Sequence, residues 1–195
     1  MKFNLKNFAK RVLLAALSLG VFSGCASFNS PPQKQAPSVG ARNEGYALLY
    51  ELISKQKDVS KILIIKKEKS DLHNLIKTIA ETSKQMAQQL ETFAKKDPQL
   101  NLKLKNLPLL EQKTRAAIEK TDGQELLLAK KRDFELRLLL TQIESSRYAS
   151  HLAKTVAESE TQPERKAWLA QTAQRWETLH GQILNLIASR YVRDF

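Results

Sequence analysis

Apolar residues recur every three or four positions along most of this chain, and this spacing constrains the fold more than any other feature. The pattern is clearest between residues 72 and 94, where polar side chains occupy the opposite face. The apolar stripe consists of Leu72, Leu75, Ile76, Ile79, Ala80, Ser83, Met86, Ala87, Leu90, Phe93 and Ala94. Such a period predicts an amphipathic α-helix. Glycine is scarce and no segment alternates as a strand does, so the sequence predicts an all-α protein.

Four further segments, one before and three after this one, are predicted to be helical. An earlier stripe is formed by Leu48, Leu49, Leu52, Ile53, Val59, Ile62 and Leu63, and we expect a break from the next helix near residues 66–70. Pro108 has the first-turn position of a short helix that runs through Lys120. Thr121-Asp122-Gly123 then predicts an interruption, followed by a long helix from about residue 124 to 159 whose start has the capping-box spacing Asp122 and Glu125. The last helix is expected to begin near Pro163.

Four substantial helices joined mostly by short connections favour an antiparallel four-helix bundle with one extra short helix, which we assign to residues 43–195. A long dimeric coiled coil is the less favoured alternative, because the breaks interrupt any heptad pattern.

The start of the chain carries a targeting pattern that ends at Cys25, its only cysteine. Four basic residues precede an apolar run from Val12 to Phe22, and Gly24 stands directly before the thiol. The pattern resembles a bacterial lipoprotein signal peptide. The resemblance implies that residues 1–24 are removed and that Cys25 receives lipid. Because Ala26 follows the cysteine, it also implies sorting to the outer membrane, with the domain facing the periplasm. An ordinary secretory signal and an uncleaved anchor remain alternatives, although the apolar run is about half of the roughly 20 residues that a spanning helix needs.

Residues 25–42 are expected to form a flexible tether, because serine, proline and glycine leave little to bury there. Four of the 32 basic residues and none of the 20 acidic ones lie before Cys25, so the chain from Cys25 onward has a net charge of +8. Such an excess favours anionic envelope components. The alternative is that lysines and arginines only solvate the outer faces of the helices. No nucleic-acid-binding motif is visible, so nucleic acid is not an expected partner.

One spacing has chemical content, the pair Glu177 and His180. A carboxylate and an imidazole three residues apart lie on one side of a helix, and facing helices can complete such a pair into a site for iron or another divalent metal. Glu51, Glu135 and Glu144 lie on other predicted helices and could approach it, with Glu144 the preferred third ligand. The simpler interpretation, which we favour, is a hydrogen-bonded histidine at the edge of the core, a solvated Glu177 and no cofactor.

The region from about residue 44 to 188 also resembles periplasmic ferritin-like bundle proteins. The resemblance is carried by Glu68-Lys-Ser-Asp-Leu72, Ile79-Ala-Glu81, Phe134, Gln142-Ile-Glu144 and Trp176-Glu-Thr-Leu-His180. Where that family tends to carry further histidines this chain has Ser83 and Ser146, so the resemblance implies a bundle used as a scaffold or binding surface.

No arrangement of nucleophile, base and acid is visible, and the sequence has neither a glycine-rich phosphate loop nor paired thiols. The favoured hypothesis is a non-enzymatic, lipid-anchored bundle that contacts an envelope protein or an anionic envelope component, or associates with itself. The alternative is a metal-binding or redox bundle centred on Glu177 and His180.

Overall fold

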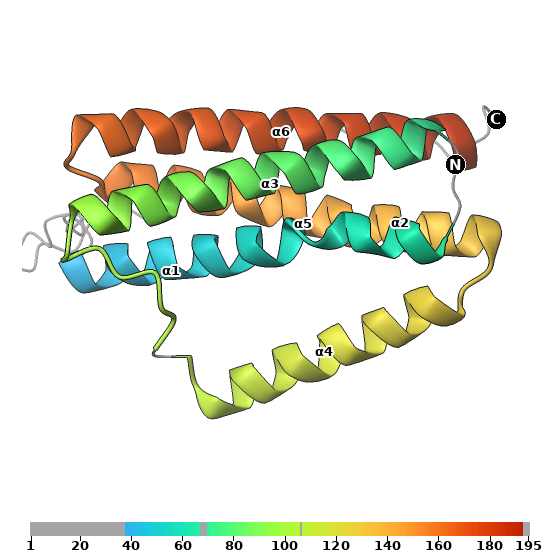
Figure 1. The fold of residues 1–195 in the computed structure, drawn as a ribbon, viewed down its shortest axis with the longest axis horizontal. Helices are drawn as coiled ribbons and strands as arrows, with labels where there is room; N and C mark the ends of the chain where they lie inside the picture. Colours follow the sequence, from blue (N-terminus) through green and yellow to red (C-terminus); the bar gives the residue numbers. More distant parts are fainter. Residues whose placement is uncertain (1–37, 67–69, 106, 193–195) are drawn as a thin grey trace, which may run out of the picture. The chain divides into compact units, whose positions relative to one another are not determined.

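The computed structural model describes residues 38–66, 70–105 and 107–192, and within these ranges every regular element is a helix. In chain order the elements are α1 (Val39–Gln56), the 3-10 turn η1 (Val59–Lys61), α2 (Ile62–Ile65), α3 (Ser70–Lys96), α4 (Leu109–Leu128), α5 (Lys131–Ser159) and α6 (Pro163–Tyr191) (Figure 1). The predicted all-α class is confirmed for these residues. The predicted signal peptide, Cys25 and most of the predicted tether lie outside them.

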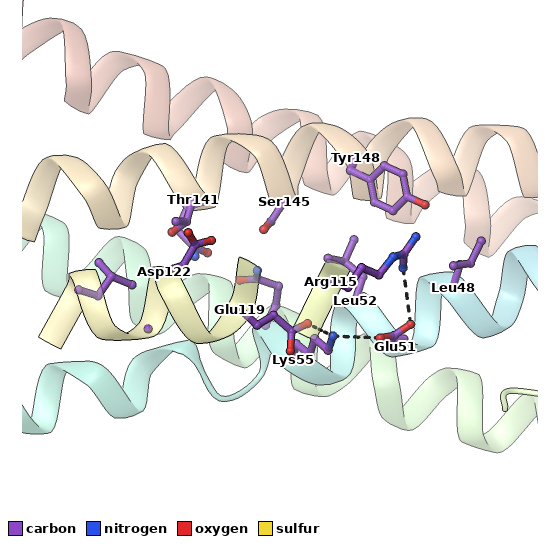
Figure 2. Close-up of a pocket in the computed structure, with 14 residues that line it drawn as sticks. Leu48, Glu51, Leu52, Lys55, Arg115, Glu119, Asp122, Thr141, Ser145 and Tyr148 are labelled. Atoms are coloured by element: carbon purple, nitrogen blue, oxygen red, sulfur yellow. Dashed lines mark hydrogen bonds and ion pairs between the residues drawn. The ribbon is translucent and has the colours of Figure 1, made fainter. Parts of the chain in front are cut away.

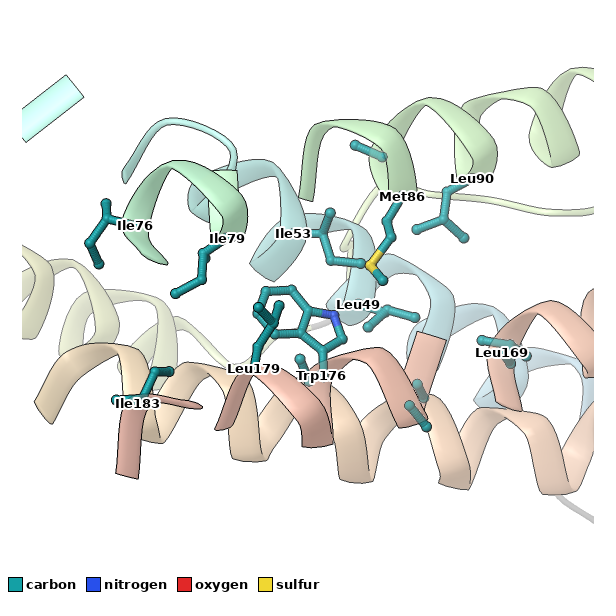
Figure 3. Close-up of a cluster of buried hydrophobic side chains, with 14 of the residues drawn as sticks. Leu49, Ile53, Ile76, Ile79, Met86, Leu90, Leu169, Trp176, Leu179 and Ile183 are labelled. Atoms are coloured by element: carbon teal, nitrogen blue, oxygen red, sulfur yellow. The ribbon is translucent and has the colours of Figure 1, made fainter. Parts of the chain in front are cut away.

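Four of the helices pack around one hydrophobic core and form what we call the bundle, namely α1, α3, α5 and α6. The consecutive helices α5 and α6 share the most extensive interface, while α1 packs against α3 and α5. Figure 3 shows Trp176 of α6 among aliphatic side chains of α1 and α3, and this indole is only 1% exposed. Among the described residues, the core cluster and the side chains packed against it lie between Tyr46 and Tyr191.

The expectations for the first half of the bundle agree with the structure. Every residue of the predicted stripe between 72 and 94 is buried or half-buried in α3. The expected break also occurs, because α2 ends at Ile65 and α3 begins at Ser70. The expectation of a flexible tether is wrong for its last four residues, 39–42, which are helical. The helix starts at Val39 instead of residue 43, because the Ser38 side chain accepts a hydrogen bond from the Ala41 amide (3.2 Å) and so caps α1.

The predicted boundary between the short helix and the long helix is wrong. Thr121, Asp122 and Gly123 continue α4, and the chain breaks at Ala129 and Lys130 instead. A tertiary contact accounts for the difference, since the Lys66 ammonium group donates hydrogen bonds to the carbonyl oxygens of Leu127 (3.0 Å) and Ala129 (2.9 Å). A cation at the carbonyl end of a helix satisfies its free acceptors. The sequence gives no local indication of this partner from another helix.

Close contact between α1 and α5 depends on Gly45. A Cβ atom added at this glycine would lie 2.6 Å from the Cγ2 atom of Val156, which is far inside van der Waals contact. At Gly181 of α6, by contrast, an added Cβ would meet no atom within 4 Å. The two positions therefore form a matched pair of helical glycines, one tightly packed and one open.

We predict that Gly45→Ala lowers the free energy of unfolding by about 1–3 kcal/mol, because overpacking forces α1 and α5 apart. Gly181→Ala should raise it by up to about 1 kcal/mol through helix propensity alone. Urea denaturation measures both values. Val156→Ala should partly relieve the Gly45→Ala defect in a double-mutant cycle. Equal effects of the two glycine substitutions would contradict the close contact.

Candidate functional site

The residues of the predicted metal site are all on the described helices, but they have other partners. Glu177 is exposed on α6 and pairs with Lys154 of α5, and this hydrogen bond lowers the pKa of the Glu177 carboxyl. His180 is half-buried, and its Nδ1 atom lies 3.1 Å from the Ser146 hydroxyl and 3.3 Å from the Ile143 carbonyl oxygen. Both neighbours of this nitrogen belong to α5.

The carboxylates that could have completed this site are paired with cations or exposed. Glu51 lies beside Lys55 of its own helix, Glu135 is buried against Arg190, and Glu144 is exposed. Within residues 38–66, 70–105 and 107–192, no group of three histidine, cysteine or acidic side chains could hold a metal ion. The structure therefore places His180 at the edge of the core with a hydrogen-bonded neighbour and does not assemble the predicted ligands.

A different feature stands out, because α4 buries none of its residues although it is 20 residues long. Its half-buried residues, which we call the inner face, are Glu111, Arg115, Asp122, Gly123 and Leu126. The helix thus turns mainly charged groups toward the bundle. In Figure 1, α4 extends along the bundle at an angle and approaches it most closely near the start of α5.

Polar contacts link α4 to the bundle. Lys55 of α1 pairs with Glu51 (2.9 Å) and with Glu119 of α4, and these hydrogen bonds raise the pKa of the lysine although its partial burial opposes the shift. Arg115 of α4 lies 3.9 Å from the Glu51 carboxylate, as Figure 2 shows. Ion pairs of this half-exposed kind contribute little stability each. They hold α4 beside the bundle without drawing it into the core.

A cavity of about 460 Å³ lies between the inner face of α4 and helices α1 and α5 (Figure 2). We call it the α4 cavity. Its apolar wall is formed by Leu48, Leu52, Leu126 and Tyr148, and its polar groups come from Glu51, Lys55, Gln56, Arg115, Glu119, Asp122, Thr141, Gln142 and Ser145. The cavity thus combines a small apolar wall with a larger number of polar side chains.

The opposite side of α4, the outer face, combines leucine with lysine. It consists of Leu109, Leu110, Lys113, Ala117, Lys120, Leu127 and Leu128, all of them exposed. Leu110 is 77% exposed and Leu128 is 80% exposed. They are 18 residues apart, which is five turns of about 3.6 residues, so they lie on one line along the helix. Lys130, Lys131 and Arg132 follow directly and are exposed as well.

The sequence contains a signal for this surface that the periodicity analysis did not use. The pairs Leu109-Leu110 and Leu127-Leu128 repeat at five whole turns with lysines between them, but the predicted interruption at Asp122 assigned them to two helices. Once the helix is continuous, the two pairs fall on the same side.

A buried ionic cluster at the turn between α5 and α6 is a second site that the sequence did not indicate. Glu160 is 3% exposed and accepts hydrogen bonds from the Tyr46 hydroxyl of α1 (2.6 Å) and from the Arg165 guanidinium of α6 (2.9 and 3.1 Å). Arg165 also donates to Asp97 after α3 (2.7 Å), and the backbone amides of Thr161 and Gln162 donate to Glu160 (both 2.8 Å). The cluster connects the ends of all four bundle helices.

Burial alone would raise the pKa of the Glu160 carboxyl, but hydrogen bonds from Arg165, the loop backbone and Tyr46 outweigh it and lower the pKa to about 2. Burial and the bond to Glu160 raise the pKa of Tyr46. The ionised carboxylate is thus the form that the fold stabilises, and its hydrogen-bonded partners give the cluster a structural role.

Among the described residues, no helix has the length and apolar content that crossing a bilayer requires. The chain matches no protein-family model, no curated protein and no solved structure at a significant level.

We predict that Glu160 makes stability depend on acid pH. The pKa of Glu160 is near 2 in the folded state, whereas the reference value for a glutamate is 4.5. Its contribution to the free energy of unfolding is therefore complete above pH 4.5 and is lost as the pH falls toward 2. Glu160→Gln should lower the free energy of unfolding at pH 7 by about 3–5 kcal/mol, because it leaves Arg165 buried with a partner removed. Urea unfolding at pH 7, 4 and 3 measures this.

Glu158→Gln is the matched control, because Glu158 is exposed in the last turn of α5, two residues before Glu160. It should leave both the stability and its pH dependence nearly unchanged. If Glu160→Gln lost stability between pH 4.5 and 2 as steeply as the unmodified chain does, the low pKa of Glu160 would be contradicted.

Proposed function

We propose that this chain is a lipid-anchored helical-bundle protein of the cell envelope that acts by binding, and that the outer face of α4 is its contact with an anionic membrane surface. In this proposal α1, α3, α5 and α6 form an antiparallel four-helix scaffold, and α4 is the additional helix that it presents. The observation that carries the proposal is the leucine and lysine surface of α4, which the bundle leaves uncovered.

The composition of the outer face favours a membrane surface over other partners. Interfacial helices place leucines at the boundary between headgroups and acyl chains and place lysines against anionic headgroups. Each lysine or arginine near an anionic surface contributes about 1 kcal/mol. Lys113 and Lys120 lie among the leucines, the segment 130–132 adds three basic residues, and the outer face carries no acidic side chain.

The expected lipid on Cys25 supports the same arrangement. A lipid anchor keeps the domain at the membrane, which raises the effective concentration of a weakly binding surface. The outer face then needs only a modest affinity of its own for the membrane. Its two leucine pairs and its few basic side chains would supply that affinity. Cys25 and the outer face thus have separate roles, in attachment and in orientation.

The experiment separates these roles by using the chain from Ala26 to Phe195, which lacks the lipid and contains the whole core. We predict that it binds vesicles containing about one-third phosphatidylglycerol, measured by cosedimentation, and that raising the salt concentration weakens the binding. The double substitution Leu110→Asp and Leu128→Asp should reduce the binding at least tenfold. It replaces two leucines that would move from water into the membrane with charged side chains. Leu184→Asp, at a half-exposed leucine of α6, should not reduce the binding.

Other outcomes would contradict this proposal. Equal binding to neutral vesicles, or unchanged binding after the double substitution, would rule out the outer face as an anionic-membrane contact. A dimer in solution that the double substitution converts to monomers would identify a second copy of the chain as the partner instead. The anchor is tested in the full chain, where labelled fatty acid should be incorporated and Cys25→Ser should abolish the incorporation.

A further inference from the structure

We propose that this chain forms a domain-swapped dimer, in which α4 and α5 join into one continuous helix and the α5–α6 pair packs against α1 and α3 of a second copy. This inference concerns the junction between α4 and α5 and does not depend on the membrane contact of the outer face. It follows from a conflict between the sequence of the junction and its conformation.

The residues at the junction favour a helix. Residues 126–136 contain neither glycine nor proline, and positions 126–132 hold only leucine, alanine, lysine and arginine. These four residue types have high helix propensities. The sequence therefore favours one helix through the junction, which agrees with the long helix that turn signals and periodicity predict from about residue 124 to 159.

The structure instead bends the chain at this point. Ala129 and Lys130 are extended, with ψ angles of 146° and 135°, and the next residue, Lys131, has a φ of 40°. Among the residues that the structure describes, Lys131 is the one non-glycine residue with a positive φ. This conformation is unfavourable for a residue with a Cβ atom. The bend is therefore strained.

A side chain from outside the junction holds the bend. The Lys66 ammonium group, which follows α2, donates hydrogen bonds to the carbonyl oxygens of Leu127 (3.0 Å) and Ala129 (2.9 Å). In a continuous helix these two carbonyls would accept hydrogen bonds from the amides of Lys131 and Asp133. Lys66 thus replaces hydrogen bonds that the bend removes.

The rest of the fold permits the exchange. Helices α5 and α6 share the most extensive interface of the bundle, so they can move together. No residue of α4 is buried, and its ion pairs with Lys55 and Glu51 reach α1, so a straight junction leaves them in place. A straight α4–α5 helix carries α5 and α6 away from their own α1 and α3, and a second copy offers them the same core. Short connections under strain favour such an exchange.

The first test compares two substitutions at Lys131, which is exposed. Lys131→Gly relieves the strain of the bend and weakens a continuous helix, whereas Lys131→Ala retains the strain and supports the helix. Both remove the same charge. The chain from Ala26 to Phe195 is refolded at high concentration, and light scattering after size exclusion measures the dimer. We expect a dimer for the unmodified chain and for Lys131→Ala, and a dimer fraction at least about fivefold lower for Lys131→Gly.

A second set of variants tests the contact that holds the bend. Lys66→Met should raise the dimer fraction severalfold, because it removes both hydrogen bonds to the end of α4. Lys77→Met, at an exposed lysine of α3, is the matched control and should have no effect. Leu110→Asp should also have no effect, which distinguishes this dimer from one that forms through the outer face.

Cross-linking shows which helices are exchanged. Asn74 of α3 and Asn185 of α6 are exposed and line one groove between these helices. A chain with Asn74→Cys and a second chain with Asn185→Cys, neither of which has another cysteine after Cys25, are refolded together. The isolated dimer, treated with a short bismaleimide, should give a covalent pair of chains on a denaturing gel.

Three outcomes would overturn the proposal. They are a dimer that this reagent does not cross-link, equal dimer fractions for Lys131→Gly and Lys131→Ala, and the absence of any dimer from the unmodified chain and from Lys66→Met.

Discussion

A single buried carboxylate, Glu160, holds together the end of the bundle where its four helices meet. Its hydrogen bonds reach α1 through Tyr46 and α6 through Arg165, and Arg165 continues the cluster to Asp97 beyond the end of α3. A buried ion pair of this kind adds little net stability compared with apolar packing. It does restrict the arrangement of the helix ends, because any arrangement that separates the partners leaves a buried charge unpaired. It fixes the relative positions of the helix ends, while the core around Trp176 supplies most of the favourable free energy.

The bundle is complete without α4, and the proposed functions follow from this fact. Of the α4 leucines, Leu126 packs against the core, whereas the leucines of the outer face find no place in it and remain exposed. The ion pairs of Lys55 and Arg115 attach α4 by its charged side. One helix therefore presents two different surfaces, an inner face that closes a cavity and an outer face that carries leucine and lysine. Substitutions on the two faces of α4 can therefore alter what the protein binds without altering the residues of the core.

Sequence periodicity predicted the helices whose apolar stripes are continuous, above all α3. When one side of a helix is buried, apolar residues recur every three or four positions in the sequence. Periodicity failed at the start of α5, where local turn signals at Asp122 and Gly123 are overridden by the contact of Lys66 with the end of α4. It also missed the Glu160 cluster, whose members are far apart in sequence and carry no shared pattern. For His180, the favoured interpretation was a hydrogen-bonded histidine at the edge of the core and the metal site was the alternative, but spacing along one helix could not identify Ser146 and Ile143 as its neighbours.

The central claim is that α4 is held beside the bundle by polar contacts and is free to bind an anionic membrane with its outer face. Amide hydrogen exchange of the chain from Ala26 to Phe195, with and without anionic vesicles, tests it most directly. We predict that the amides of α4 exchange much faster than those of α5 in solution, and that vesicles slow exchange selectively in α4. Equal protection of α4 and α5 without vesicles, or protection by vesicles at another helix, would contradict the account.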